Sequence, residues 1–273
     1  MRWINKRPER STALLLAVLP FALALLAYVV GSDIRLSENP NDKLLPSLQQ
    51  MGDAVERMAF REDRRSGEYL LWSDTLYSLR RLAMGVALSA LTGLVVGLGM
   101  GLLPGARSTL SGFVAALSLI PPLALLPILF IVFGLGELAK VTLIVIGITP
   151  FLIRDLAQRT LEIPAEQLIK AQTLGASTWQ IVLRVALPQV LPRLITALRL
   201  ALGPAWLFLI AGEAIAATGG LGYRIFLVRR YLAMDVILPY VFWITLLAFA
   251  SDLLLRFLSR RAFRWAHSDG NGL

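Results

Sequence analysis

Few residues of this 273-residue chain have the type and spacing that bond-making chemistry needs. Cysteine is absent, which excludes a thiolate nucleophile, a disulfide and a cysteine metal site. The single histidine, His267, stands in the carboxyl-terminal tail. The lysine of a nucleotide-binding P-loop directly follows a glycine, whereas the four lysines here follow Asn, Asp, Ala and Ile. We therefore predict that the chain is not an enzyme and itself binds no metal, cofactor or ATP.

Two charged residues stand out because they lie within apolar sequence. Arg199 and Glu213 fall in one predicted span, about residues 195–217, and a charge in mid-bilayer costs roughly 2.5 to 3.5 kcal/mol on insertion scales. Glu213 either forms a structural salt bridge, for which Arg224 is the expected partner, or contacts a gate or a solute. Arg199 either extends its charge to the membrane surface or lines a solute path. Asp252 has Arg256 four residues later as its simplest partner.

The elements that position these charges are predicted to be membrane-spanning helices. Hydrophobic residues make up 56% of the chain and charged residues only 16%, about two thirds of the charged share of a soluble protein. Six apolar runs can each form a span of roughly 20 residues once flanking residues are added. They are residues 11–32, 82–106, 108–136, 141–153, 200–212 and 236–251. The predicted fold class is therefore all-α, a polytopic membrane protein with six transmembrane helices.

The charges between the runs predict the orientation of the chain. Basic residues gather before the first run, at Arg107 and after the last run, whereas acidic residues outnumber basic ones in residues 31–75. By the positive-inside rule, both termini and residues 160–190 are cytoplasmic and residues 31–75 are external. We predict a cytoplasmic N-terminus at 1–10, one transmembrane domain at 11–265 and a cytoplasmic tail at 266–273. The net charge of +9 then reports topology and not a nucleic-acid partner.

One segment within this apolar chain must lie in water, and we call it the polar loop, residues 164–188. Pro164 suits the first position of a helix, and Gly175 suits the left-handed residue that ends one. The helix between them is about eleven residues long, too short for a bilayer. Ser177 and Gln180 have the spacing of a capping box that opens a second helix. Four apolar residues of this loop are available for contact: Leu168, Ala171, Leu174 and Trp179.

Prolines and glycines mark special places in the runs. Pro121 and Pro122 interrupt the third run, so residues 119–127 are either the wall of a solute path or a structural kink. Glycines in and just before the second run are expected to let helices pack closely. They are Gly85, Gly93, Gly97, Gly99 and Gly101. In the external segment, an amphipathic helix is predicted from Leu48, Met51, Val55 and Met58.

Several short motifs resemble those of a known family. Gly175, followed after nine residues by Val185-Ala186-Leu187-Pro188, resembles the cytoplasmic signature of ABC importer permeases. The residues Ile120 to Ala124, Phe133 to Lys140, Leu174 to Ser177 and Gly220 to Tyr223 are similar to the branch that imports nitrate, sulfonates and taurine. This resemblance covers roughly residues 44–265.

The resemblance implies a type I ABC importer permease in a bacterial inner membrane. Its implied partners are a second copy of the chain, two cytoplasmic ATPase subunits that bind ATP and Mg, a periplasmic or lipid-anchored solute-binding protein, and lipid. The residues implied to contact the ATPase are Glu166, Leu168, Ile169, Lys170, Ala171, Leu174, Gly175, Ala176, Ser177 and Trp179. One departure is that the acidic residue of the family signature falls on Ile169, while Glu166 stands one turn earlier.

The solute is less well defined by the sequence. The amino-acid sequences of residues 168–181 and 226–240 are similar to those of permeases associated with urea carboxylase and guanidine-carboxylating enzymes. Guanidine or a related small nitrogen compound is therefore the first expectation, and a sulfonate, taurine or nitrate is the second. Pro121, Pro122, Arg199 and Glu213 are the expected path residues. The alternative function is an ion-coupled secondary transporter, although no half-to-half repeat supports it.

Overall fold

The computed structural model describes residues 9–40, 42–64 and 66–266, in which helices are the regular structure and no strand occurs. His267, the tail after it and the basic residues Arg2, Lys6 and Arg7 lie outside the described residues. The chain divides into two compact units. The first unit holds residues up to Leu70 together with Val228–Val241, and the second holds Leu71–Leu227 and the chain from Phe242 onward.

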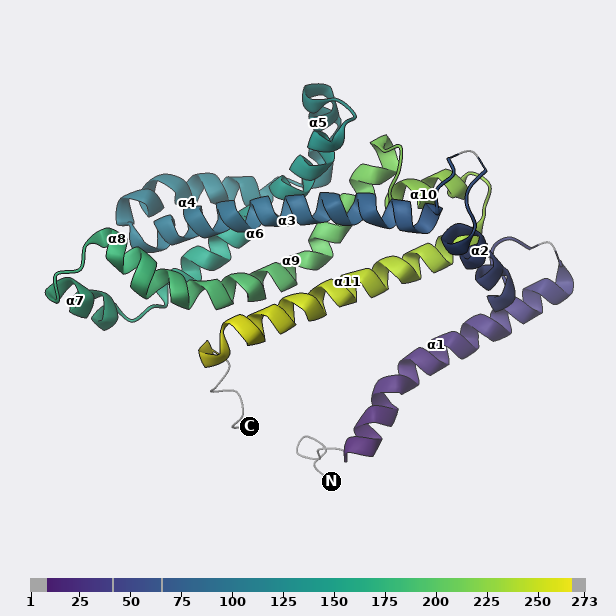
Figure 1. Ribbon diagram of the computed structural model, residues 1–273, viewed down its shortest axis with the longest axis horizontal. Coiled ribbons are helices and arrows are strands. Elements are labelled where there is room, and N and C mark those ends of the chain that lie inside the picture. The colour runs from purple at the N-terminus through teal and green to yellow at the C-terminus, as the bar shows by residue number, and fades with distance from the viewer. Residues whose placement is uncertain (1–8, 41, 65, 267–273) are drawn as a thin grey trace. The chain divides into compact units, whose positions relative to one another are not determined.

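Within the described residues, five helical segments are long and apolar enough to cross a membrane (Figure 1). They are α1 (Arg10–Glu38), α3 (Leu70–Leu102), α6 (Glu137–Leu161), α9 (Leu187–Ala216) with the turns that precede it, and α11 (Met234–Ala262). A sixth span is formed if α4 (Pro104–Leu119) and the segment Pro122–Phe133 count as one broken helix. The predicted all-α fold with six spans is confirmed in this sense.

The first unit contains α1 and the short helix α2 (Leu48–Phe60). The Tyr28 hydroxyl donates a 2.7 Å hydrogen bond to the Pro46 carbonyl, which joins α1 to the chain entering α2. Ser47 and Gln50 then form a capping box that starts α2. The predicted amphipathic helix is therefore present.

The buried side of α2 differs from the stripe that its large residues suggested. Ala54 and Ala59 are the buried residues of this helix. Leu48 is 53% exposed and Val55 is 36% exposed. The buried residues of α2 are therefore small, while two of the large apolar side chains point outward.

In the second unit, α3 and α6 pack through a row of glycines. A Cβ atom added at Gly85, Gly93, Gly97 or Gly101 would lie 2.7, 2.8, 2.8 or 2.3 Å from Ile144, Leu152, Leu156 or Thr160, respectively. Each of those distances is too short for a real side chain, so the close approach of the helices requires glycine. Gly99 faces open space, so the packing role predicted for it is wrong.

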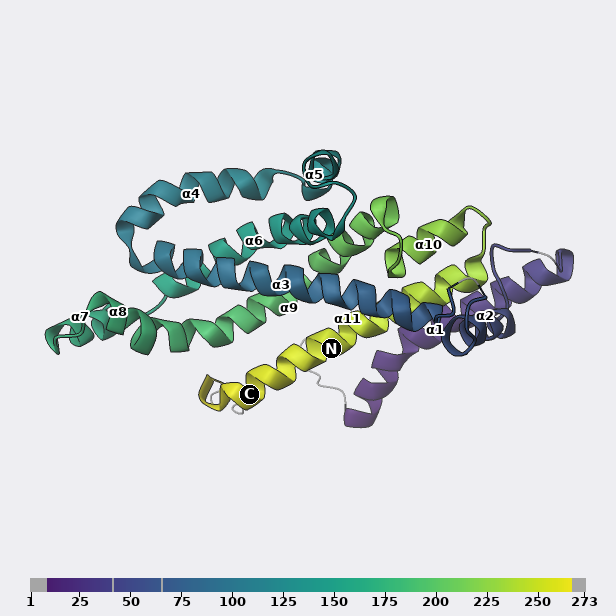
Figure 2. The same cartoon turned by 45° about the horizontal axis from the view of Figure 1, so that its top comes forward.

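The third run breaks where the prolines predict. α4 ends at Leu119, and Ile120 and Pro121 are extended before a 3₁₀ turn at Pro122–Leu125 leads into α5 (Leu126–Phe133). The two parts of the span are bent by 84°. Figures 1 and 2 both show α5 turning away from the line of α4. Gly134, with φ of 72°, ends α5 before α6 begins.

Helices α6 and α9 also pack against each other in this unit. A Cβ on Gly147 of α6 would lie 2.3 Å from the Phe208 ring of α9. Both helices contain internal prolines, Pro150 in α6 and Pro192 and Pro204 in α9. The two helices therefore combine a close contact with interrupted backbone hydrogen bonding.

Candidate functional site

The polar loop has the helix, turn and helix that its sequence predicts. Helix α7 (Ala165–Thr173) has nine residues, two fewer than expected, because Pro164 is its N-cap and Leu174 its C-cap, so neither is a helical residue. Gly175 has φ of +80°. The Gly175 and Ala176 amides donate to the carbonyls of Gln172 and Ala171 at 2.9 and 3.0 Å. This is the Schellman arrangement that ends a helix at a left-handed glycine.

The second half of the polar loop leads into α9 through an irregular helix. Ser177 and Gln180 form the predicted capping box at the start of α8 (Thr178–Ile181). The next segment, Val182–Ala186, is a π-helix, and α9 continues directly from it. Single π-turns within helices are rare and concentrate at functional sites.

The apolar residues of the polar loop divide into two sets. Ile169, Leu174 and Trp179 are 57%, 81% and 68% exposed. Leu168, Ala171 and Ala176 are half-buried. The polar residues Glu166, Lys170 and Ser177 are exposed. Large apolar side chains exposed on a water-facing segment indicate a contact surface for another molecule.

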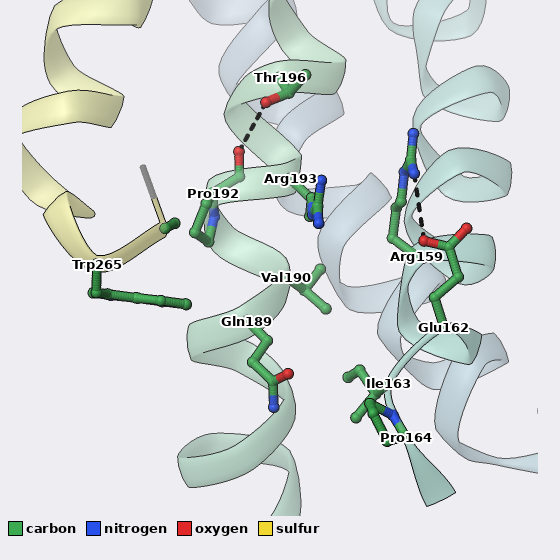
Figure 3. Close-up of a pocket in the computed structure, with 11 residues that line it drawn as sticks. Arg159, Glu162, Ile163, Pro164, Gln189, Val190, Pro192, Arg193, Thr196 and Trp265 are labelled. Carbon is green, nitrogen blue, oxygen red and sulfur yellow. Dashed lines mark hydrogen bonds and ion pairs between the residues drawn. The ribbon is translucent and has the colours of Figure 1, made fainter. Parts of the chain in front are cut away.

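A hollow of about 490 Å³ lies at the base of the polar loop (Figure 3). Arg159 and Glu162 from the end of α6 are joined there by a 3.3 Å ion pair. Across the hollow, the Gln189 side chain of α9 donates a 3.0 Å hydrogen bond to Gln167 of α7. This bond ties the short helix of the loop to the start of a spanning helix.

A buried network of charges lies at the end of the second unit opposite the polar loop, as Figures 1 and 2 show by the places of α7 and α10 (Leu221–Arg229). Glu213 is fully buried and accepts a 2.7 Å hydrogen bond from Arg81, which is 2% exposed. Ser78 donates to both carboxylate oxygens of Glu213, at 2.8 and 2.9 Å. The Gly222 amide donates to it at 2.9 Å. Glu213 is therefore in a salt bridge, as one of the two predictions had it.

The expected partner of Glu213 was wrong. Arg224 pairs with Asp74 at 2.8 Å, and Asp74 also accepts a 2.9 Å bond from the Gly220 amide. Arg81 takes the place expected for Arg224 because α3 brings it directly beneath the turn that follows α9. Its Nη1 atom also donates to the Gly219 carbonyl at 2.7 Å. A Cβ on Gly220 would lie 2.6 Å from the Glu213 carboxylate, so only glycine fits over it.

The first residues of α6 complete the network. Glu137 accepts two hydrogen bonds from Arg81, at 2.6 and 2.8 Å, and one from Lys140 at 3.1 Å. Within the described chain, the network thus joins three acidic and three basic side chains, so their charges balance. Ser78 and Arg81 belong to this network but were not predicted from the sequence. The signal was available, because Asp74, Ser78 and Arg81 follow the spacing of one helical face.

Arg199 forms a second ion pair between distant helices. Its Nε and Nη2 atoms donate to the two carboxylate oxygens of Asp252, at 2.6 and 3.0 Å. The prediction that Asp252 pairs with Arg256 is wrong, because packing of α9 beside α11 brings a stronger, two-pronged partner within reach. Arg199 accordingly has a structural partner across the bundle.

An open cavity of about 750 Å³ lies in the second unit beside the broken span. We call it the break cavity. Its lining residues are Leu117, Ser118, Ile120, Pro122, Ile146, Gly147, Pro150, Phe151, Arg154, Asp155, Gln158, Pro204 and Phe208. Of the expected path residues, Pro122 lines this cavity, whereas Pro121, Arg199 and Glu213 do not. The described residues contain no group of three acidic or histidine side chains that could hold a metal ion.

A family model and individual related proteins both place this chain among transport permeases. Residues 89–264 match the family model described as binding-protein-dependent transport system inner membrane component. The chain is 37% identical over 195 residues to the taurine transport system permease protein of Escherichia coli, covering 71% of each chain. It is 28% identical over 211 residues to a putative aliphatic sulfonates transport permease protein of Bacillus subtilis, covering 77% of this chain and 76% of that one.

Two solved structures are similar over most of their length. One is the inward-facing MetNI methionine ABC transporter, with a TM-score of 0.54, 26% identity and coverage of 72% of this chain and 99% of that one. The other is a bacterial alginate ABC transporter in complex with an alginate pentasaccharide-bound periplasmic protein. It has a TM-score of 0.61 at 14% identity and covers 93% of this chain and 98% of that one, which supports the shared fold alone.

Proposed function

The chain belongs to the family of binding-protein-dependent transport system inner membrane components and is a multi-pass permease of an ABC importer, and from this premise we propose that its polar loop docks a separate ATPase subunit. The observation that carries the proposal is the exposure of Ile169, Leu174 and Trp179 on the short helix and turn of the polar loop. Such side chains are the usual anchors of a protein interface.

The geometry of the loop suits the transmission of movement. Gly175 fixes the turn between α7 and α8, and the Gln167–Gln189 bond holds α7 against α9. A pull on α7 would therefore act on α9, a long apolar helix, and through the Arg199–Asp252 pair on α11. ATP binding and hydrolysis would take place on the partner, since this chain has no P-loop lysine.

The partners follow from the same premise. We propose that a second copy of the chain completes the path, that two ATPase subunits bind Mg and ATP at the cytoplasmic face, and that a periplasmic or lipid-anchored binding protein delivers the solute. The polar loop and both termini are then cytoplasmic, as the positive-inside rule predicts. The break cavity, lined by Pro122, is proposed as part of the solute path.

The solute proposed is a small anion of the sulfonate, taurine or nitrate type. The taurine and aliphatic sulfonate permeases named above support this class. The expectation of guanidine has no relative to support it and stays an untested prediction. An ion-coupled mechanism is the competing class, and it predicts that uptake stops when the ion gradient collapses and not when ATP is depleted.

The docking role can be tested in proteoliposomes that hold the permease, its ATPase and the loaded binding protein. Trp179→Ala is expected to lower the stimulated ATPase rate at least tenfold, because a central aromatic anchor contributes about 2 kcal/mol or more. Insertion and yield should stay at wild-type levels. The matched control is Phe249→Ala, an equally exposed aromatic side chain on α11 (62% against 68%). Unchanged stimulation in Trp179→Ala would reject the docking role.

A further inference from the structure

Three helical segments meet at the break cavity, and each is interrupted by a proline in its wall. Pro122 opens the 3₁₀ turn after α4, Pro150 lies inside α6 and Pro204 lies inside α9. A proline has no N–H, so the carbonyl four residues earlier loses its helical partner. These carbonyls belong to Ile146 and Leu200 in α6 and α9.

Freed carbonyls at membrane depth need water or protein as a partner. Ile146 itself lines the break cavity. A cavity bordered by three proline interruptions is therefore a place where water is favoured inside an otherwise apolar bundle. This property separates the break cavity from a simple gap between packed helices.

The two charged residues in the cavity wall, Asp155 and Arg154, differ in whether they form an ion pair. Asp155 lies 3.7 Å from Arg159 on the next turn of α6, so its charge already faces a cation. Arg154 also lines the cavity and is exposed. In the part of the chain that the structure describes, no hydrogen bond or ion pair joins Arg154 to another residue. Its guanidinium is thus a cation in the wall without a protein counter-ion.

An unpaired guanidinium in such a wall has a defined preference. Its five donors fit two oxygens of an oxyanion at once. Nearby, the Gln158 side chain lines the same wall and adds amide donors. A cavity of about 750 Å³ has the size of a small-molecule site.

We propose that Arg154 determines the specificity of the solute path by binding the oxyanion group of a small monoanion, such as an alkyl sulfonate, in the break cavity. This inference rests on the proposed function, because it assigns the solute class of the same permease. It names a residue outside the polar loop, and so it can fail while the docking role stands. Arg154→Lys keeps the charge but loses the two-pronged geometry, so it should fall between wild type and the neutral variant.

The experiment measures solute uptake and ATP hydrolysis together in proteoliposomes that contain the permease, its ATPase and its binding protein. The solutes are 2-aminoethanesulfonate, ethanesulfonate and guanidinium, each supplied with a binding protein that is loaded with it. In Arg154→Gln, sulfonate uptake per ATP hydrolysed should fall about ten- to a hundredfold, the range expected for loss of a charge-assisted pair of hydrogen bonds. ATPase stimulation by the loaded binding protein should remain.

The matched control is Arg260→Gln. Arg260 is an exposed arginine in the last turn of α11 and lines none of the cavities described above. The Arg260→Gln substitution removes the same charge from the predicted cytoplasmic side, and it should leave solute uptake per ATP hydrolysed unchanged. Equal losses in the two variants would mean that Arg154 acts only through the charge of the membrane surface, and would overturn the proposal.

Reversal of the charge gives the second arm. Arg154→Glu should abolish sulfonate uptake and raise guanidinium uptake relative to wild type. Faster transport of guanidinium than of sulfonate by the wild-type protein would overturn the proposal and favour a cation path. Failure of the proposed function has a different signature: Trp179→Ala would keep full ATPase stimulation, whatever the result at Arg154.

Discussion

The two ends of the second unit hold charged and polar residues in opposite ways. At one end, Arg81 and Glu213 are 2% and 0% exposed and have hydrogen-bonding partners from α3, α6 and the turn after α9. At the other end, Glu166 and Lys170 of the polar loop are exposed, and the loop is shaped by bonds between near neighbours in sequence. One end is a buried interior, and the other is an exposed surface.

The buried network and the polar loop therefore differ in how strongly each is tied to the rest of the second unit. A buried charge network resists rearrangement because any broken contact leaves a charge in an apolar interior. A loop held by its own caps can move as a piece, because its internal bonds do not depend on the rest of the chain. A permease that must rock between states is expected to need both kinds of region.

The largest effect is expected where the buried network loses a partner. Arg81→Ala leaves the fully buried Glu213 without its cation, which should lower the free energy of unfolding by about 3 to 5 kcal/mol. The measurement is denaturation in mixed micelles followed by tryptophan fluorescence. The control is Arg80→Ala, which removes an exposed arginine at the next position and should cost less than 0.5 kcal/mol. Similar losses in both variants would contradict the comparison.

A double substitution sharpens the same prediction. Replacing Arg81 and Glu213 together by methionine should lower the free energy of unfolding by less than Arg81→Ala or Glu213→Ala alone, because no charge is left buried without a partner. A strictly additive loss would mean that the two residues do not stabilise each other.

The glycine row between α3 and α6 should give the next largest effect. Gly101→Ala places a methyl group 2.3 Å from Thr160, so overpacking should cost about 1 to 3 kcal/mol. Gly99→Ala meets nothing within 4 Å and should be neutral or stabilising, because alanine favours the helix. The same unfolding measurement on this matched pair tests the packing. Equal behaviour of the two variants would argue against close contact of α3 and α6.

The polar loop should show a small change in stability and a large change in function. Gly175→Val forces a branched side chain into the left-handed region, which costs about 1 to 2 kcal/mol locally. Because the loop is exposed, the unfolding free energy should fall by no more than this, while ATPase stimulation is lost. Asn tolerates this backbone conformation, so Gly175→Asn should retain more stimulation than Gly175→Val. Full stimulation in Gly175→Val would contradict the importance of the turn.

The smallest effect is expected from an ion pair in the first unit. The pKa of the Asp42 carboxyl lies below its usual value, first because the Leu44 amide donates to it at 2.8 Å and then because it pairs with Arg35. A depressed pKa means that the stabilisation is present above the unfolded-state pKa and is lost as the pH falls through the folded-state pKa. Hydrogen exchange of residues 42–45 should therefore accelerate in acid. In Asp42→Asn the rate, corrected for intrinsic exchange, should already be high at neutral pH.

The comparison also explains which parts of the site could be predicted from sequence. The caps of the polar loop depend on Gly175, Ser177 and Gln180, which act within three to five residues of themselves, so their spacing predicted the fold of the loop. Pro121 and Pro122 broke the third run for the same local reason. The predicted length of α7 was two residues too long because Pro164 and Leu174 take the N-cap and C-cap positions, an end effect that pattern alone does not resolve.

The partners of the buried charges could not be predicted in the same way. Arg81 and Glu213 are 132 residues apart, and Arg199 and Asp252 are 53 apart. A buried carboxylate needs a cation, and several arginines in the sequence meet that requirement. Distance along the sequence favours the nearest arginine in each case, which is not the partner in the structure. Only the packing of α3, α9 and α11 decides which arginine reaches which carboxylate.

By itself, the sequence determined the membrane class, the span count, the break at the prolines and the caps of the polar loop, because apolar run length and capping chemistry act locally. The tertiary structure decided the network around Glu213, the pairing of Arg199, the outward direction of Ile169, Leu174 and Trp179, and the cavity that exposes Arg154. Those features depend on which helix faces meet, and that is decided by packing between segments far apart in the sequence.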